Sequence, residues 1–154
     1  MKKVWIVNQH ANTPDLAGHT RQYELANGLT KIGWSVSVFS SDFSLSERKF
    51  KKLKKNQFLL IERISQIDWY WLRVLGYREN NWKRYLNLIS FNVNLIIILF
   101  FLGLKSLIKG SKPDALIASS PQLPATFICL IYSKIFRIKF VSEIRDLWPQ
   151  VLID

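Results

Sequence analysis

The first forty residues contain the pattern that decides the fold. Val4-Trp5-Ile6-Val7 is a short apolar run that ends at Asn8, and Val36-Ser37-Val38-Phe39 is a second run that ends at Ser40-Ser41. Runs of this length and composition are typical of buried strands. Between them, from His19 to Ile32, apolar side chains recur at helical spacing, and Gly33 follows as a C-terminal stop. A strand–helix–strand unit of this length predicts two parallel strands joined by a right-handed crossover.

The same alternation returns near the end of the chain. Ala115-Leu116-Ile117-Ala118 predicts a third strand, residues 123–136 predict an apolar helix, and Phe140-Val141-Ser142-Glu143-Ile144 predicts a fourth strand. Strands that alternate with helices predict an α/β fold. We expect a Rossmann-like, doubly wound and mainly parallel sheet with helices on both faces. With 154 residues the chain has the size of one domain, residues 1–154.

Residues 43–85 form a basic and aromatic-rich insertion in this pattern. They contain eleven Lys or Arg against four Asp or Glu, together with nine aromatic residues, whereas the whole chain carries a formal charge of +11. Within the insertion, residues 46–56 suggest a short polar helix, Phe58-Leu59-Leu60-Ile61 a strand, and residues 68–82 irregular structure.

Tryptophan mixed with Lys and Arg favours a membrane interface, where amphipathic rings and long cationic side chains are both stable. The alternative is a solvated charged face with ordinary core aromatics. A nucleic-acid partner is not expected, because no recognised motif accompanies the charge. The membrane hypothesis names five residues as membrane-facing: Trp69, Trp71, Trp82, Lys51 and Lys52.

Residues 86–104 are nineteen residues without a charge, bracketed by Lys83-Arg84 and Lys105. Their length approaches the ~20 apolar residues that cross a bilayer. Asn87, Ser90 and Asn94 nevertheless fall on one stripe of a helix. This stripe favours a helix that packs on a sheet or lies in an interface, and a transmembrane span remains the alternative.

The start of the chain lacks the pattern of a secretory signal peptide. Cys129, the single cysteine, is expected to be a small buried residue that forms no disulfide. The two histidines, His10 and His19, show no metal-ligand spacing, so no metal or other cofactor is expected, and each histidine is more simply structural.

Three loops follow the carboxyl ends of predicted strands, where open α/β sheets place their sites. In the first loop, Gly18 precedes a predicted helix that begins with His19, Thr20 and Arg21. The free backbone amides at the start of this helix, together with Arg21, suit a phosphate group. The alternative is an ordinary strand-to-helix turn. The second loop, residues 119–121, contributes hydroxyl groups. In the third, ionisable residues cluster at a strand end, which indicates either a polar ligand or a structural ion pair.

Three motifs, in order along the chain, resemble family-4 glycosyltransferases of the GT-B class. They are the Gly18 loop with Arg21-Gln22-Tyr23-Glu24-Leu25-Ala26, the run Lys112-Pro113-Asp114-Ala115-Leu116-Ile117-Ala118-Ser119-Ser120-Pro121, and the ending Glu143-Ile144-Arg145-Asp146-Leu147-Trp148-Pro149. The last motif is similar to the O-antigen and capsule branch, which includes fucosamine and other amino-sugar transferases.

The resemblance implies one half of a two-domain enzyme that transfers a sugar from a nucleotide-sugar with retention of configuration and without a metal. It implies a lipid-linked glycan as acceptor, made for lipopolysaccharide or capsule at the cytoplasmic face of the inner membrane. The expected roles are catalysis for Arg145 and Asp146, donor-phosphate binding for Gly18, His19 and Arg21, and acceptor binding for Ser119, Ser120, Glu143 and Trp148.

The family's C-terminal donor-binding domain is absent from this sequence, so the chain by itself is expected to be an incomplete enzyme. Charge on the leaving diphosphate needs stabilising groups on both walls of the cleft. The alternative is a non-catalytic subunit that docks on the membrane and recruits a separate donor-binding subunit.

Overall fold

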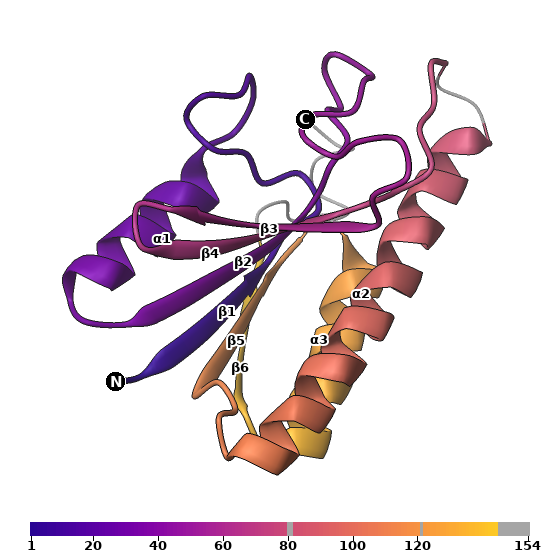
Figure 1. Cartoon of the computed structure of the whole chain (residues 1–154). Coiled ribbons are helices and arrows are strands. Elements are labelled where there is room, and N and C mark those ends of the chain that lie inside the picture. The colour runs from indigo at the N-terminus through magenta and orange to yellow at the C-terminus, as the bar shows by residue number, and fades with distance from the viewer. Residues whose placement is uncertain (80–81, 121, 145–154) are drawn as a thin grey trace, which may run out of the picture.

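The computed structural model contains one six-stranded sheet and three helices, and it describes residues 1–79, 82–120 and 122–144 (Figure 1). The elements, in chain order, are β1 (Lys3–Val7), α1 (Arg21–Lys31), β2 (Ser35–Ser41), β3 (Leu59–Ile64), β4 (Ile67–Leu72), α2 (Lys83–Lys109), β5 (Ala115–Ser119), α3 (Leu123–Phe136) and β6 (Lys139–Glu143).

The sheet has the strand order β3-β4-β2-β1-β5-β6. β1 is central and pairs in parallel with β2 on one side and with β5 on the other; β4 and β6 extend the parallel part outward. Only the β3–β4 pair is antiparallel among the pairs that the structure describes. The predicted fold class, a Rossmann-like and mainly parallel doubly wound sheet, is confirmed.

The helices cover the two faces of the sheet unequally. α1 lies on one face, and α2 and α3 lie side by side on the other (Figure 1). Because alternate strand residues point to opposite faces, Val4 and Ile6 of β1 join the core under α1, whereas Trp5 and Val7 join the core under α2 and α3. Each face therefore has its own hydrophobic core.

The polar stripe of α2 points inward, as its spacing predicted for a packed helix. Phe91 and Leu95 on that side are fully buried, and the Asn87 side chain donates a hydrogen bond to the Leu75 carbonyl (2.7 Å) and accepts one from Gln9 Nε2 (2.7 Å). These amides satisfy backbone and side-chain groups that would otherwise be buried without partners. The stripe therefore joins α2 to the sheet and to the loop before the helix.

Two predictions inside the insertion were wrong. Residues 67–72 form β4, an interior strand, and not irregular structure; its turn from β3 consists of Ser65 and Gln66, both at positive φ, without the Gly or Asn that usually marks such a turn. Residues 46–56 do not form a helix. Like charges three and four residues apart would repel on a helix, and the Asp42 carboxylate instead accepts hydrogen bonds from the amides of Lys52 and Leu53.

The prediction that Trp69 and Trp71 face a membrane was also wrong, since both side chains are fully buried. They point from β4 into the core under α1, where their rings pack against each other at 5.4 Å. Each indole N–H has an internal acceptor: Ser40 Oγ for Trp69 and the Glu62 carboxylate for Trp71. Trp82, in contrast, is 64% exposed.

Replacing Trp69 should therefore damage the core. We expect Trp69→Ala to lower the free energy of unfolding by about 3–5 kcal/mol, because it removes a buried aromatic side chain and leaves a cavity. Trp82→Ala, the matched control on an exposed residue, should change the free energy of unfolding by less than about 0.5 kcal/mol. Urea denaturation followed by far-UV circular dichroism measures both, and equal small effects would contradict the buried position of Trp69.

Candidate functional site

The strand order reverses between β1 and β5, and this reversal defines the candidate site. From β1 the chain crosses over through α1 to β2 on one side, and β5 continues through α3 to β6 on the other. The loops after β1 and β5 therefore diverge, and open α/β sheets bind ligands in the crevice that this divergence creates. The described residues of these two loops are 8–20 after β1, and 120 and 122 after β5.

His10 and Gln122 connect these two loops across the reversal. The nitrogen atoms His10 Nε2 and Gln122 Nε2 lie 3.0 Å apart, so a neutral imidazole accepts the amide hydrogen at this position. His10 is held by its own backbone, whose N–H donates to Asn8 Oδ1 (2.9 Å). His10 was expected to be structural, and Gln122 was not predicted as a site residue. The place of His10 just after the β1 run was the feature of the sequence that could have indicated a site.

His10 is neutral at physiological pH. The pKa of His10 is lowered to about 4, mainly by burial and in addition by the nearby Lys51, Arg84 and His19. Because Nε2 accepts from Gln122, the neutral imidazole carries its proton on Nδ1, which can donate a hydrogen bond to an oxygen atom of a ligand.

Several buried polar atoms in this crevice lack hydrogen-bond partners among the described residues. They are Gln9 Oε1, His10 Nδ1, Asn12 Oδ1 and Gln122 Oε1. Leaving such a group unpaired costs about 1–3 kcal/mol, so a concentration of them at one edge of the sheet indicates a place where polar ligand groups or water bind.

The Gly18 loop is held in shape by Asn12. The Asn12 amide donates to the Ala17 carbonyl (2.8 Å), and the Asn12 N–H donates to the His19 carbonyl (3.3 Å). Gly18 has φ of +124°, and a Cβ at this position would lie 2.3 Å from Asn12 Nδ2. The turn therefore requires glycine, both for its backbone conformation and for the space that Asn12 occupies.

The loop delivers the chain to the N-terminus of α1, which carries no side-chain cap. Thr20 stands at the N-cap, but its hydroxyl donates to the Glu24 carboxylate (3.0 Å). The first-turn amides of α1 consequently have no side-chain acceptor, and an N-terminus in this state favours an anion. Gly18 and His19 lie directly in front of it.

The structure brings the predicted donor and acceptor residues together through Arg21 and Glu143. The Arg21 guanidinium lies 2.6 Å from the Glu143 carboxylate, which also accepts a hydrogen bond from the Ser119 hydroxyl. The Ser120 N–H donates to the Glu143 carbonyl (2.9 Å), so β5 and β6 end at the same level. Gly18, Arg21, Ser119, Ser120 and Glu143 therefore lie on one edge of the sheet. Arg145, Asp146 and Trp148 lie outside the described residues.

A small cavity of about 210 Å³ joins the Gly18 loop to the insertion. Its lining residues are His10, Asn12, Gly18, His19, Phe43, Leu45, Ser46 and Lys51. Ligand sites in proteins typically have volumes of about 300–1,000 Å³, so this cavity suits a phosphate group or part of a sugar rather than a complete nucleotide-sugar.

Lys51 and Lys52, predicted to face a membrane, both contact other residues of the chain. Lys51 lines this cavity, donates to the Ser41 carbonyl (3.0 Å) and lies over the Trp71 ring, and its burial lowers its pKa to about 8. Lys52 pairs with Asp15 (2.9 Å) and lies 3.7 Å from Glu62, which ties the Gly18 loop to β3. Both lysines are engaged in internal contacts because the insertion folds back over the sheet edge.

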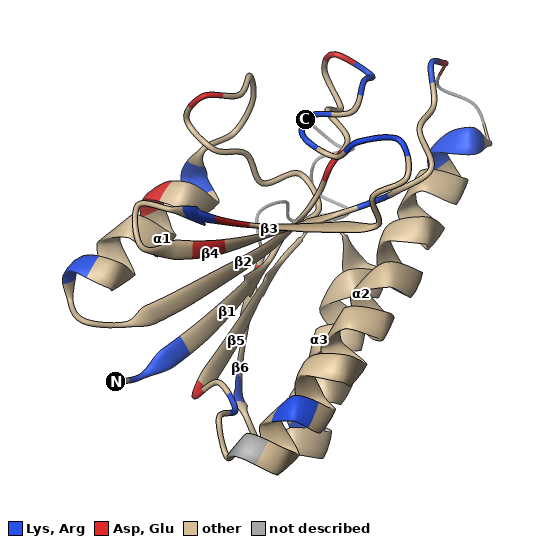
Figure 2. Ribbon diagram, viewed as in Figure 1, with Lys and Arg blue, Asp and Glu red and all other residues tan. Residues whose placement is uncertain are grey.

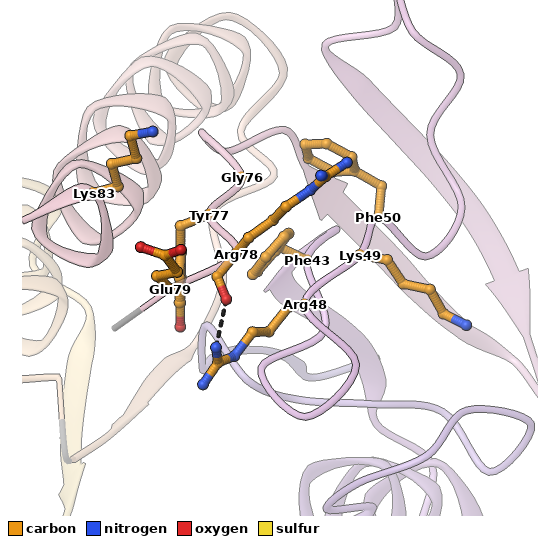
Figure 3. Close-up of a pocket in the computed structure, with 9 residues that line it drawn as sticks. All are labelled: Phe43, Arg48, Lys49, Phe50, Gly76, Tyr77, Arg78, Glu79 and Lys83. Atoms are coloured by element: carbon orange, nitrogen blue, oxygen red, sulfur yellow. Dashed lines mark hydrogen bonds between the residues drawn. The ribbon is translucent and has the colours of Figure 1, made fainter. Parts of the chain in front are cut away.

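A second, cationic pocket adjoins the first and shares Phe43 with it (Figure 3). It has a volume of about 630 Å³ and is lined by Arg48, Lys49, Arg78, Lys83 and Glu79 around the aromatic rings of Phe43, Phe50 and Tyr77. Arg48 donates to the Arg78 carbonyl and so closes one side of the pocket. Four cationic side chains against one carboxylate favour an anionic ligand.

The glycine turn can be tested with two alanine variants. Gly18→Ala should lower the free energy of unfolding by about 1–3 kcal/mol, because φ is unfavourable for alanine and Asn12 must move. Gly28→Ala is the control: it lies in α1 with no atom within 4 Å of the added Cβ, and it should raise the stability by up to about 1 kcal/mol. Urea denaturation measures both, and a stabilised Gly18→Ala would contradict the described turn.

The protonation of His10 has a measurable consequence for stability. The unfolded chain binds a proton near pH 6.5 and the folded chain only near pH 4, so the contribution of neutral His10 is complete above pH 6.5 and is lost as the pH falls from 6.5 to about 4. His10→Gln should flatten the stability profile in this window relative to the parent. NMR titration of the imidazole reports the pKa directly, and a midpoint near 6.5 would contradict the burial of His10.

Comparisons with known proteins bear on the fold alone. No family model and no curated protein matches this chain. Among solved structures, the C-terminal domain of a hydrogenase from Pyrococcus furiosus is similar, with a TM-score of 0.57 and 12% sequence identity over 92% of this chain and 91% of that domain. At this identity the likeness supports the α/β architecture and carries no information on activity.

Proposed function

We propose that this chain is the acceptor-side half of a retaining glycosyltransferase. It transfers a sugar from a nucleotide-sugar to a lipid-linked glycan in the synthesis of a cell-surface polysaccharide such as O-antigen or capsule. The donor is held by a second domain, and the work takes place at the cytoplasmic face of a membrane.

The observation that carries the proposal is the ion pair between Arg21 and Glu143. It joins the glycine turn at the front of the chain to the strand end that opens the Glu143–Pro149 motif, and the two motifs lie far apart in sequence. Two of the three motifs that resemble family-4 enzymes thus meet on one edge of the sheet, and Ser119 from the third contacts the same carboxylate. Residues from α1, β5 and β6 therefore meet at one edge of the sheet.

Each part of this edge suits a different portion of the substrates. The uncapped N-terminus of α1, with Gly18 and His19, suits the donor diphosphate. Glu143 and Ser119 can bind sugar hydroxyl groups, and neutral His10 with Gln122 can do so at the strand-order reversal. Arg145 and Asp146 are proposed to act at the reacting atoms, as the family resemblance implies. The cationic pocket is proposed to hold the acceptor diphosphate.

The volume of the cavity at Gly18 is consistent with half of a substrate site. The cavity at Gly18 is about 210 Å³, smaller than a nucleotide-sugar needs, and it opens at the sheet edge. Electrostatic stabilisation of the leaving diphosphate would then come from both walls of the cleft. This chain provides one wall.

A non-catalytic membrane-docking subunit is the second candidate function. It is favoured by the extent of apolar surface on α2 and α3, where large side chains such as Phe100 and Phe127 are more than half exposed. In that case the chain would hold a separate donor-binding subunit near lipid-linked substrates without contributing reacting groups.

Glu143→Gln tests the proposed function. We expect it to lower the rate of sugar transfer by about tenfold to a hundredfold, because it removes a charge that pairs with Arg21 and a strong hydrogen-bond acceptor. Transfer is measured from a panel of nucleotide-sugars to polyprenyl-diphosphate sugars, with the chain supplied with its donor-binding domain. Binding of a short-chain polyprenyl-diphosphate sugar to the chain itself is a second readout.

Asp68→Asn is the matched control, since the Asp68 carboxylate pairs with the exposed Arg63 guanidinium at the amino end of β4, the opposite end of the sheet from the site. It should leave both readouts unchanged. Transfer at the parent rate in Glu143→Gln, or absence of transfer and acceptor binding over the whole panel, would refute the proposal.

A further inference from the structure

We propose that the outer surface of α2 and α3 docks flat on an anionic membrane, with both helices parallel to the membrane plane. This inference deepens the proposed function by naming the surface that holds the chain at the membrane. The biological role of this docking rests on the proposed function, but lipid binding itself can be measured without sugar transfer.

The surface begins with a continuous apolar stripe on α2. Its members recur at spacings of three and four residues and are between 42% and 71% exposed: Ile89, Val93, Ile96, Phe100, Leu104 and Leu107. This spacing follows one side of a helix. The stripe is opposite the side that Phe91 and Leu95 bury against the sheet.

α3 extends the stripe sideways. Leu123, Phe127, Ile131 and Ile135 are spaced four residues apart and are between 44% and 72% exposed. We call the two stripes together the α2–α3 face. A groove of about 510 Å³ separates them; its walls, which include Ile96, Phe100, Leu104, Ile131 and Ile135, are formed entirely by hydrophobic and aromatic residues.

α2 and α3 pack closely against each other, so their exposed apolar stripes form one continuous surface. Gly103 of α2 lies against the Phe136 ring of α3, and a Cβ at this position would lie 2.5 Å from that ring. α3, the shorter helix, runs beside α2 over part of the length of α2 (Figure 1). A monomer rarely leaves a contiguous apolar surface of this extent open to water, and such surfaces mark interaction sites.

α2 is long enough to cross a bilayer, but its contacts favour an in-plane position. The span from Lys83 to Ile108 passes the length and composition criteria of a membrane span, and about a third of its most apolar window is buried. Phe91, Leu95 and Leu99 belong to the core with the sheet, and Asn94 donates to the Arg73 carbonyl. A helix that keeps these contacts can present only its other side to lipid.

The distribution of charge selects a lipid surface with negative headgroups. Between residues 82 and 142 the sequence has eight Lys or Arg and a single acidic residue, Asp114. Asp114 accepts a hydrogen bond from the Lys3 N–H at the opposite end of β1 from the site. α2 and α3 carry no carboxylate (Figure 2).

The cations lie at the ends of the helices and leave the middle of the face apolar. Arg84 is exposed at the start of α2, and Lys105, Lys134 and Arg137 are exposed toward the other end of the helix pair. Long basic side chains at the rim of an apolar face can reach anionic headgroups while the face enters the interfacial region. Trp82 and Tyr85, 64% and 69% exposed, add the ring types that favour this interface.

This orientation would place the candidate site beside the membrane. α2 begins at the edge of the sheet where β1 ends, since Asn87 of its second turn bonds Gln9 and the charge of Arg84 acts on His10. A lipid-linked substrate that remains in the membrane could then reach the strand-order reversal without leaving the bilayer.

Flotation of the whole chain with vesicles tests the inference. The chain should float with vesicles of phosphatidylcholine and phosphatidylglycerol in equal parts, and less with phosphatidylcholine alone. Raising the salt concentration should weaken binding to the anionic vesicles, because charged contacts at the rim are screened. A chain that stays soluble and unbound at low salt with both vesicle types would overturn the inference.

The double variant Phe100→Glu with Ile131→Glu identifies the face. It places two charges at the centre of the face, on exposed positions, and should lower the bound fraction by about tenfold. Phe58→Glu with Ile61→Glu is the matched control, with similar exposure on and beside β3. Circular dichroism verifies the fold of both, and equal flotation of the two double variants would refute the assignment of this face.

Light scattering separates lipid from a second copy of the chain. A dimer that Phe100→Glu with Ile131→Glu dissociates, together with no vesicle binding by the parent, would overturn the inference in favour of self-association. Loss of sugar transfer with intact flotation would refute the proposed function alone, whereas intact transfer to a soluble acceptor without flotation would refute only the membrane face.

Discussion

The central position of β1 is the constraint on which the rest of the structure depends. β1 pairs in parallel on both sides, with β2 and with β5, and every parallel connection must cross over in the right-handed sense. The connections on its two sides therefore run over opposite faces of the sheet: α1 covers one face, and α2 and α3 cover the other. The divergence of the loops after β1 and β5 follows from this, and it produces the crevice that contains His10 and Gln122.

The edge where these loops meet is polar, and several of its hydrogen-bonding groups have no partner among the described residues. The sheet below it is apolar and well packed. Gly18 holds a backbone conformation that other residues avoid, the N-terminus of α1 lacks a side-chain cap, and polar atoms of Gln9 and Asn12 are buried without partners among the described residues. The uncapped helix end and the unpartnered polar atoms each reduce stability by a modest amount. Their concentration at one edge is expected of a site that gains its missing contacts from a ligand.

α2 combines two roles that a single helix seldom has. One side packs on the sheet through Phe91 and Leu95 and is joined to the loop after β1 by Asn87. The other side is apolar and exposed over almost its whole length. The same helix therefore contributes to the α2–α3 face and contacts the loop of the candidate site.

The sequence by itself determined the parallel α/β fold and the polar stripe of α2, because both depend on local periodicity. It misplaced Trp69 and Trp71, since composition does not tell whether an aromatic side chain points inward. Only the tertiary structure decided this. The tight Ser65-Gln66 turn makes β4 an interior strand and buries its tryptophans, and the contact of Arg21 with Glu143 arises solely because remote strands end at the same level of one sheet.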